Sequence, residues 1–240
     1  MLGPEYVDEI LESTTPRGKK RRHSKVNSII VHTTGFGPGL DRINTRNKGN
    51  LKAIGADYAK RMAGILKYKG HFLIDHTGKI WQFLPLQEIA WHSSSGKKKL
   101  LLSESPFTWW AERWGEQYAN PTELPSWKLG NLNLSTVGID LLAHGNGTIT
   151  KGYTKAQYKS LAKLATALAD KLEIELKRDT ILGHEDVDPL SRGTSKGGWD
   201  PGAFDWGRFF SLLEGEEEEK VEKPKYDVIS YILSLFGFKR

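Results

Sequence analysis

A short buried strand that runs into a polar loop is encoded by the stretch VNSIIVHTT, residues 26–34. Its first part, Val26 to Val31, is rich in β-branched apolar side chains, which favour a buried strand. The apolar run stops abruptly at His32, and a loop containing glycine and proline follows. We therefore expect His32 to stand just past the end of a rigid strand, where a functional side chain is held better than in a free loop.

A second strand is predicted from Thr136 to Leu142, where apolar residues alternate with Gly138 and Asp140. Alternation of period two places the apolar side chains on one face of a sheet and Asp140 on the other, away from the core. A last short strand, Thr180 to Leu182, is ended by Gly183 and His184. Two histidines are thus predicted at strand ends, and a carboxylate on a strand.

The remaining elements are predicted from their periodicity and from turn and capping residues. A hairpin is expected over residues 71–84, around the turn Asp75-His-Thr-Gly78. Helices are expected at Tyr6–Leu11, Leu51–Leu66, from the cap Thr154 to about Leu172, and at Phe204–Leu213. The aromatic-rich stretch Lys97–Asn133 has no clean period, and it suits either a local mini-core or a sugar-stacking platform.

Composition limits the classes of site. The 240 residues, 38% of them hydrophobic, can bury one substantial core, and with no cysteine any metal must be held by His, Asp or Glu. No export signal is recognisable at the N-terminus and no run is long enough to span a membrane, so we expect cytoplasmic synthesis. Residues 1–213 hold 30 Lys and Arg against 22 Asp and Glu, a surplus that suits anionic partners or serves solubility alone.

Chemistry is suggested by three residues, namely His32, His184 and Asp200, the last sixteen positions after His184. A hydrolytic zinc site needs three protein ligands and one open position. Each residue could instead have a purely structural role. His32 and His184 could be hydrogen-bonded loop histidines, and Asp200 could be the first residue of a β-turn before Pro-Gly. Asp140 could likewise be a solvated carboxylate on the sheet face.

Six segments in order resemble the amidase family that includes phage lysozyme-type amidases, bacterial wall-recycling amidases and animal peptidoglycan-recognition proteins. They span roughly Val26 to Leu213. They are SIIVHTT at 28–34, GHFLIDHTGKIWQF at 70–83, AWH at 90–92, TVGIDL at 136–141, GHEDV at 183–187 and WDPGAFDW at 199–206. The resemblance implies an α/β fold, with a central mixed β-sheet flanked by helices on both faces and a zinc-bearing groove at one edge.

The resemblance also implies roles for single residues. Zinc (Zn2+) would be held by His32, His184 and Asp200, and Asp140 would act as general base toward the attacking water. The family branch with an aspartate ligand usually has glutamate as this base, so Asp140 is one methylene shorter. The family's oxyanion-stabilising lysine, two positions before the aspartate ligand, is replaced here by Gly198, and we assign the role to Lys196, which could swing into the same space.

Substrate contact is expected at His92, together with its neighbour Trp91, because the Ala-Trp-His loop resembles a segment that lines the family's groove. His71 and His76 could instead be read as a metal pair, but they flank a hairpin turn in segments that the family uses as scaffold. His144 is expected at the surface. Tyr68 lies near the family's catalytic tyrosine, but Gly70 appears at the matching position, so Tyr68 is excluded.

The resemblance implies an N-acetylmuramoyl-L-alanine amidase that acts on bacterial peptidoglycan, with the catalytic domain at residues 26–213. A basic arm would occupy residues 1–25, a charged linker 214–226 and an amphipathic segment 227–240, the arm and segment offering contact with anionic membrane or wall polymer. We expect a phage or prophage lytic enzyme that reaches the wall through the membrane during host lysis. The competing hypothesis is a role in cytosolic wall recycling. The alternatives are a non-cutting peptidoglycan-binding module and a nucleic-acid-binding protein, although no nucleic-acid motif is present.

Overall fold

A six-stranded mixed sheet forms the centre of the computed structural model, which describes residues 2, 5–11, 26–34, 38–64, 70–93, 132–142, 152–187 and 200–215. The spatial order of the strands is β1-β4-β3-β5-β2-β6. β3 and β4 pair antiparallel, and the other neighbours pair parallel. The strands are β1 (Glu9–Ile10), β2 (Ser28–Thr33), β3 (Phe72–Ile74), β4 (Ile80–Gln82), β5 (Thr136–Leu141) and β6 (Ile181–Gly183).

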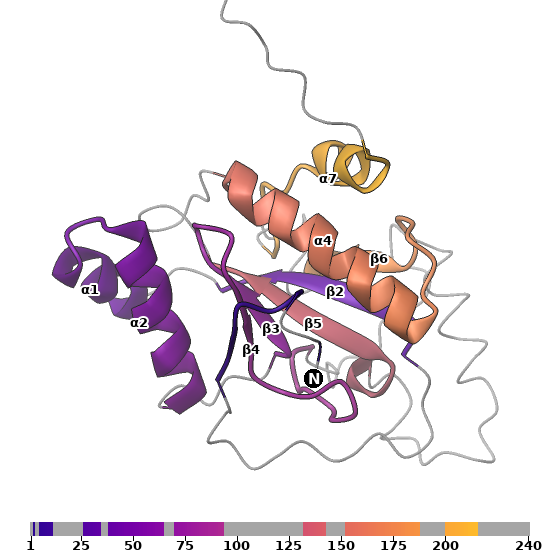
Figure 1. Cartoon of the computed structure of the whole chain (residues 1–240), viewed down its shortest axis with the longest axis horizontal. Helices are drawn as coiled ribbons and strands as arrows, with labels where there is room; N and C mark the ends of the chain where they lie inside the picture. The colour runs from indigo at the N-terminus through magenta and orange to yellow at the C-terminus, as the bar shows by residue number, and fades with distance from the viewer. Residues whose placement is uncertain are drawn as a thin grey trace, which may run out of the picture.

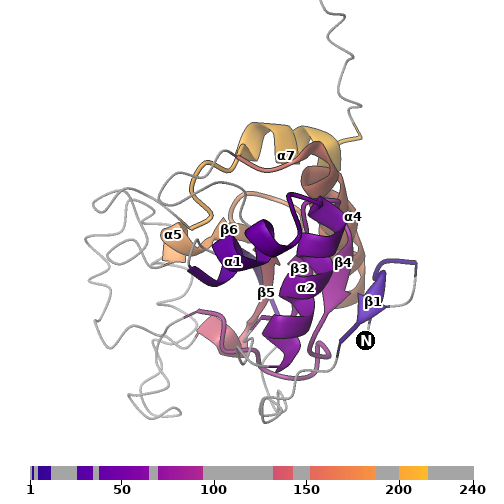
Figure 2. The ribbon, with the colours of Figure 1, turned by 90° about the vertical axis from the view of Figure 1, so that its left-hand side faces the viewer.

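Helices cover both faces of this sheet, as Figures 1 and 2 show. Helices α1 (Pro38–Arg46) and α2 (Leu51–Gly64) pack on one face, where Tyr58 and Ala59 meet Leu73 and Trp81. Helices α4 (Lys155–Leu172) and α7 (Trp206–Leu213) cover the other face, over the larger apolar cluster. A single turn of helix, α5 (His184–Val187), and a short 3-10 helix, η2 (Leu132–Leu134), complete the described elements. The predicted α/β fold is confirmed.

The sheet follows the predicted alternation. Val137, Ile139 and Leu141 of β5 belong to the core under α4, whereas Asp140 between them is half-buried on the opposite face. The predicted hairpin is also confirmed. Its turn is closed by Asp75, whose carboxylate accepts hydrogen bonds from the Thr77 amide at 2.8 Å and from the Trp81 indole nitrogen at 3.1 Å.

The predicted cap of the long helix is confirmed as a capping box. The Thr154 hydroxyl accepts from the Gln157 amide, and the Gln157 side chain in turn accepts from the Thr154 amide. Two further bonds tie this end of α4 to the sheet: Thr154 Oγ1 donates to the His76 carbonyl, and Gln157 Nε2 donates to the Leu142 carbonyl just after β5. The first turn of α4 is thereby fixed at the carboxyl end of β5.

Three predictions of secondary structure were wrong. The segment Tyr6–Leu11 is not a helix, because Glu9 and Ile10 form the edge strand β1 beside β4. A carboxylate of Asp8 accepts from the Ile80 amide at 2.7 Å, and the Lys79 ammonium donates to Glu9 at 2.6 Å, so pairing with the sheet overrides local helix propensity. The loop expected after residue 34 contains α1, and β2 continues through His32 and Thr33 instead of ending before them.

Several predictions concern segments outside the described residues. These are the aromatic stretch over residues 97–131, the basic segment 17–22, the tail from residue 216, and the single residues Tyr68, His144, Lys196 and Gly198. Within the described part of the chain, no helix is long and apolar enough to cross a membrane.

Candidate metal centre

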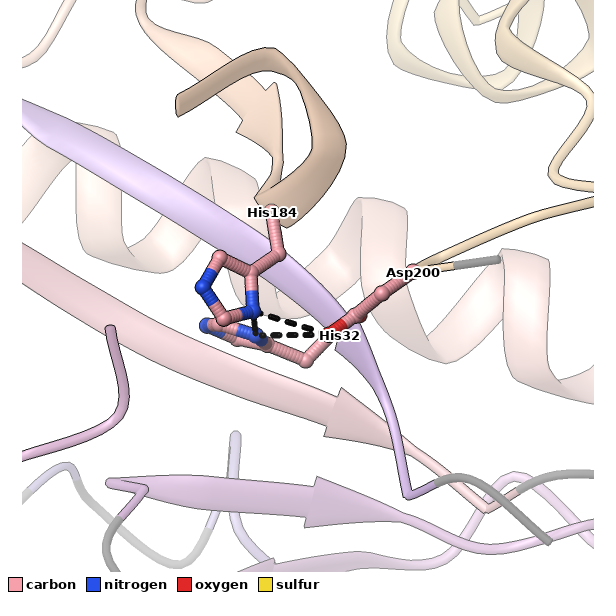
Figure 3. A group of neighbouring side chains, drawn as sticks. All are labelled: His32, His184 and Asp200. Carbon is pink, nitrogen blue, oxygen red and sulfur yellow. Dashed lines mark hydrogen bonds and ion pairs between the residues drawn. The ribbon is translucent and has the colours of Figure 1, made fainter. Parts of the chain in front are cut away.

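Three buried side chains converge at the carboxyl ends of adjacent parallel strands. His32 is the second-last residue of β2, His184 follows β6 directly, and Asp200 comes from the segment before α7. Each of the three is 3% exposed. Figure 3 shows the two imidazole rings and the carboxylate turned toward one another. The sequence prediction that these three residues lie together agrees with this geometry.

The distances suit a bound metal ion. His32 Nδ1 lies 3.1 Å from His184 Nδ1, His184 Nδ1 lies 2.8 Å from Asp200 Oδ2, and His32 Nδ1 lies 3.7 Å from the same oxygen. A tetrahedral zinc ion about 2.0–2.1 Å from each ligand atom would hold the ligand atoms about 3.3–3.4 Å apart. The three separations bracket this value. Among the described residues, this is the one group of three potential metal ligands.

The charge on Asp200 fits a ligand role. Burial by itself would raise the pKa of Asp200, but hydrogen bonds and positive charge from His184 and His32 hold it well below its ordinary value. The second carboxylate oxygen, Oδ1, accepts from the Thr33 amide at 2.8 Å. Asp200 therefore stays ionised, with one oxygen tied to β2 and the other turned toward the two imidazoles.

Backbone contacts hold the Asp200 segment beside His184. The Glu185 amide donates to the Asp200 carbonyl at 2.7 Å, and the Tyr153 hydroxyl donates to the Pro201 carbonyl at 2.6 Å. Gly183 has no side chain because Pro201 lies where one would stand: a Cβ there would be 2.6 Å from Pro201 Cδ. Burial, then the nearby carboxylates of Asp186 and Asp200, raise the pKa of Glu185 to about 7.

A separate network holds the start of α5. The buried carboxylate of Asp186 accepts from the Gly183 amide at 2.7 Å and from the Arg178 guanidinium at 2.6 Å. The same guanidinium donates to the Ile181 carbonyl and lies over the Trp206 ring, 3.9 Å from its centroid. This network brackets His184 on both sides along the chain and so restricts its position.

Asp140 stands beside this group on the neighbouring strand. The parallel register pairs Asp140 of β5 with His32 of β2, and paired residues of neighbouring strands project to the same face of a sheet. Asp140 is half-buried, and its negative charge contributes to raising the pKa values of Tyr58 and Tyr153, for which burial is the main cause. A half-buried aspartate thus lies next to His32, one of the three buried side chains.

His92 and Trp91 follow the hairpin and lie in different environments. The half-buried His92 ring places Nδ1 2.8 Å from His32 Nε2, and Nε2 3.0 Å from Thr136 Oγ1. Trp91 is 46% exposed, among the most exposed large apolar side chains of the described residues. His92 is therefore in direct contact with the group of three, and Trp91 presents an apolar surface in the adjoining residue.

Sequence comparison gives this site a family. The sequence model of N-acetylmuramoyl-L-alanine amidase matches residues 22–203, which contain all three converging side chains and Asp140. The chain belongs to the N-acetylmuramoyl-L-alanine amidase family. Its relatives include the 1,6-anhydro-N-acetylmuramyl-L-alanine amidase AmpD of Escherichia coli K12, which is 32% identical over 195 residues, 78% of this chain and 82% of the relative. The protein of the same name from Citrobacter freundii is 29% identical over 202 residues, 80% of this chain and 83% of the relative.

Solved structures similar to this amidase-family chain were also found. One is a crystal structure of a selenomethionine derivative of AmpD, with a TM-score of 0.49, 21% identity, and coverage of 89% of this chain and 99% of that one. Another is the endolysin N-acetylmuramoyl-L-alanine amidase LysCS from Clostridium intestinale, with a TM-score of 0.46, 17% identity, and coverage of 87% and 97%.

His71, weighed as a metal ligand in a pair with His76, has a structural role in this amidase-family fold. Its Nδ1 accepts from the Gly138 amide at 3.2 Å, and its Nε2 donates to the Glu88 carbonyl at 3.1 Å. Both ring nitrogens are thus bonded to the backbone, which leaves neither for a metal ion.

Several residues that shape the centre were not singled out from the sequence: Thr136, Tyr153, Asp186 and Arg178. Gly138 could have been identified from the sequence, because an isolated glycine within a strand often marks a close approach by another group. Thr136 and Tyr153 contact residues 44 and 48 positions away. Asp186 and Arg178 contact each other and residues near them in the chain, but no known sequence pattern marks this network.

Proposed function

We propose that this chain is a zinc-dependent hydrolase that cleaves the amide bond between N-acetylmuramic acid and L-alanine in peptidoglycan or its fragments. Membership of the amidase family supports the reaction class. The observation that carries the proposal is the buried triangle of His32 Nδ1, His184 Nδ1 and Asp200 Oδ2, with Asp140 paired beside His32 on the next strand. Two imidazoles and a carboxylate are a donor set that zinc accepts.

When bound, zinc polarises the scissile carbonyl and makes water acidic enough to ionise near neutral pH. In the proposed reaction, Asp140 accepts a proton as water attacks the lactyl carbonyl carbon, and the same proton then passes to the departing amine of L-alanine. The C–N bond breaks, and the products are a free carboxylate on the sugar and a free amine on the peptide. Because Asp140 is partly exposed, an incoming water and the substrate can reach it.

Other residues would serve binding and charge stabilisation. Trp91, with nearly half of its surface exposed, is suited to stack on a sugar or on an apolar part of the peptide. We assign Lys196 to stabilising the developing oxyanion. The family's position for this lysine holds Gly198, and Lys196 lies two residues before it in the sequence, from where it could reach the same space. His92 is half-buried, and its exposed part can still contact the substrate.

The names of the curated relatives support a particular form of substrate. AmpD of E. coli and of C. freundii are both called 1,6-anhydro-N-acetylmuramyl-L-alanine amidases, and the match extends over about four-fifths of each. We propose that this chain also accepts muramyl peptides that end in a 1,6-anhydro sugar. The phage or prophage lytic role expected from the sequence is the alternative biological setting, and it predicts efficient cleavage of intact, cross-linked wall.

Mass spectrometry of digests tests both levels of the proposal. Purified peptidoglycan and a soluble 1,6-anhydro-muramyl peptide would be incubated separately with zinc-loaded protein, with chelator-treated protein and with the His184→Ala variant. Release of stem peptides that begin with L-alanine, lost in both controls, supports the amidase. Faster release from the anhydro fragment supports the AmpD-like substrate, and faster release from intact wall supports the lytic role. Binding of wall without release would instead identify a recognition module.

A further inference from the structure

The His92 imidazole contacts side chains on two neighbouring strands of the metal centre, β2 and β5. One nitrogen, Nδ1, lies 2.8 Å from His32 Nε2 on β2, and the other, Nε2, lies 3.0 Å from Thr136 Oγ1 on β5. The rings of His32 and His92 meet edge to face, with centroids 5.0 Å apart. His92 therefore links a metal-ligand candidate to the neighbouring strand through both of its nitrogens.

The absence of a side chain at Gly138 leaves room on the sheet for this ring. Gly138 lies on β5 two residues after Thr136, and a Cβ built at Gly138 would be 2.4 Å from His92 Cγ. No side chain at this position could coexist with the ring where it lies. The amide of Gly138 donates to His71 Nδ1, so the backbone on which the His92 ring lies is itself held in place.

The hydrogen-bond pattern assigns the protons. His32 directs Nδ1 toward His184 and Asp200, so when Nδ1 binds a metal ion the remaining proton of that ring is on Nε2. This N–H then donates to His92 Nδ1, which must be unprotonated to accept it. The neutral His92 ring consequently carries its own proton on Nε2, which donates to Thr136 Oγ1.

We propose that His92 is a positioning residue of the metal centre: held by Thr136 and seated over Gly138, it fixes the ring orientation of His32 and so raises metal affinity. This role goes beyond the substrate contact expected from the sequence. Removing a residue that hydrogen-bonds to a metal ligand typically weakens metal affinity about 10–100-fold. The inference rests on the zinc centre of the proposed function. Its test measures metal binding in the absence of substrate.

Three substitutions at His92 separate the two roles. In His92→Asn the amide oxygen can take the place of the imidazole Nδ1 and accept from His32. In His92→Gln the amide reaches instead toward the place of Nε2, near Thr136, and His92→Ala removes both contacts. Zinc dissociation constants would be measured by competition with a chromophoric chelator on the full chain. We expect a value about 10–100-fold weaker for Ala and Gln, and within about threefold of the unmodified protein for Asn.

A second pair of variants acts without touching a metal ligand. Thr136→Val removes the hydroxyl that accepts from His92, and Thr136→Ser keeps it, with little change in volume. We expect Val, but not Ser, to weaken zinc binding several-fold, while circular dichroism of the zinc-free forms confirms that both variants fold. In the zinc-loaded protein, long-range ¹H–¹⁵N spectra should show His92 protonated at Nε2 and unprotonated at Nδ1.

The outcomes separate this inference from the proposed function. If the unmodified protein binds zinc and the Ala and Gln variants bind it equally well, with only a raised KM, His92 is a substrate contact and the inference is wrong. A His92 protonated at Nδ1 would also contradict it. If the unmodified protein fails to bind zinc, the proposed function itself fails, whatever the variants do.

Discussion

Asp140 on β5 and His32 on β2 occupy paired positions in the parallel register of the sheet. Neighbouring strands lie about 4.8 Å apart, so the pairing brings the proposed general base next to a proposed metal ligand without any loop between them. The other residues of both strands are buried. The relative position of the proposed base and the proposed metal ligand is therefore set by the sheet itself.

Replacing the proposed base tests this arrangement. Asp140→Asn keeps the size of the side chain but removes its capacity to take up a proton, so kcat should fall about 10²–10⁴-fold. Zinc content, measured by mass spectrometry of the metal, should not change. Asp140→Glu restores the carboxylate with one more methylene and should retain substantial activity. An Asn variant with full activity would remove Asp140 from the mechanism.

The close approach of Gly183 to Pro201 predicts a steric effect on the centre. In Gly183→Ala the new methyl group would lie too near Pro201, and the strain of such overpacking costs about 1–3 kcal/mol. Since Pro201 follows Asp200 directly, zinc affinity should fall as well. Gly64→Ala is the matched control, because the space around Gly64 is open. Equal zinc affinity and equal thermal stability in both variants would contradict the prediction.

The Asp186 network predicts a loss of stability. Asp186→Ala leaves the buried Gly183 amide and the Arg178 guanidinium without their shared acceptor, which should lower the free energy of unfolding by about 2–3 kcal/mol. Asp186→Asn keeps an oxygen that can accept from Gly183 and should lose less. Urea unfolding of the zinc-free proteins measures both. A loss in Asn as large as that in Ala would mean that the charge, and not the bond to Gly183, dominates.

Stability at high pH should depend on Tyr58. Burial raises the pKa of Tyr58 to about 12, whereas the unfolded value is near 10. The folded state therefore opposes ionisation of Tyr58. The contribution of Tyr58 to the free energy of unfolding is complete below about pH 10 and is lost as the pH rises through 12, at up to about 1.4 kcal/mol per pH unit. Tyr58→Phe should flatten this part of the stability curve. An unchanged slope between pH 10 and 12 would show that Tyr58 does not control it.

The sequence predicted those parts of the fold that local patterns determine. Alternation along Thr136–Leu141 and the Thr154 cap both appear as predicted, because burial of one sheet face and capping of a helix depend on residues a few positions apart. The edge strand at Glu9–Ile10 was mistaken for a helix since its partner, β4, lies some seventy residues away. Such pairing depends on tertiary structure and leaves no local signature.

The same distinction holds for the site. His32, His184 and Asp200 could be predicted together from six ordered motifs. The anchoring of His92 by Thr136 joins residues 44 positions apart, and it follows only once the strands are in register. Gly138 offered a partial signal, but what its missing side chain makes room for became evident only from the position of the His92 ring. Contacts of this kind determine how firmly predicted ligands are held.

The central claim, hydrolysis by a single metal centre formed by His32, His184 and Asp200, is tested most directly by titrating metal-free protein with zinc while measuring release of L-alanine-terminated peptide. The account predicts activity that rises with added zinc and reaches its plateau at one ion per chain, with none at any zinc concentration for His184→Ala. Full activity in the metal-free protein, or an active His184→Ala variant, would contradict it.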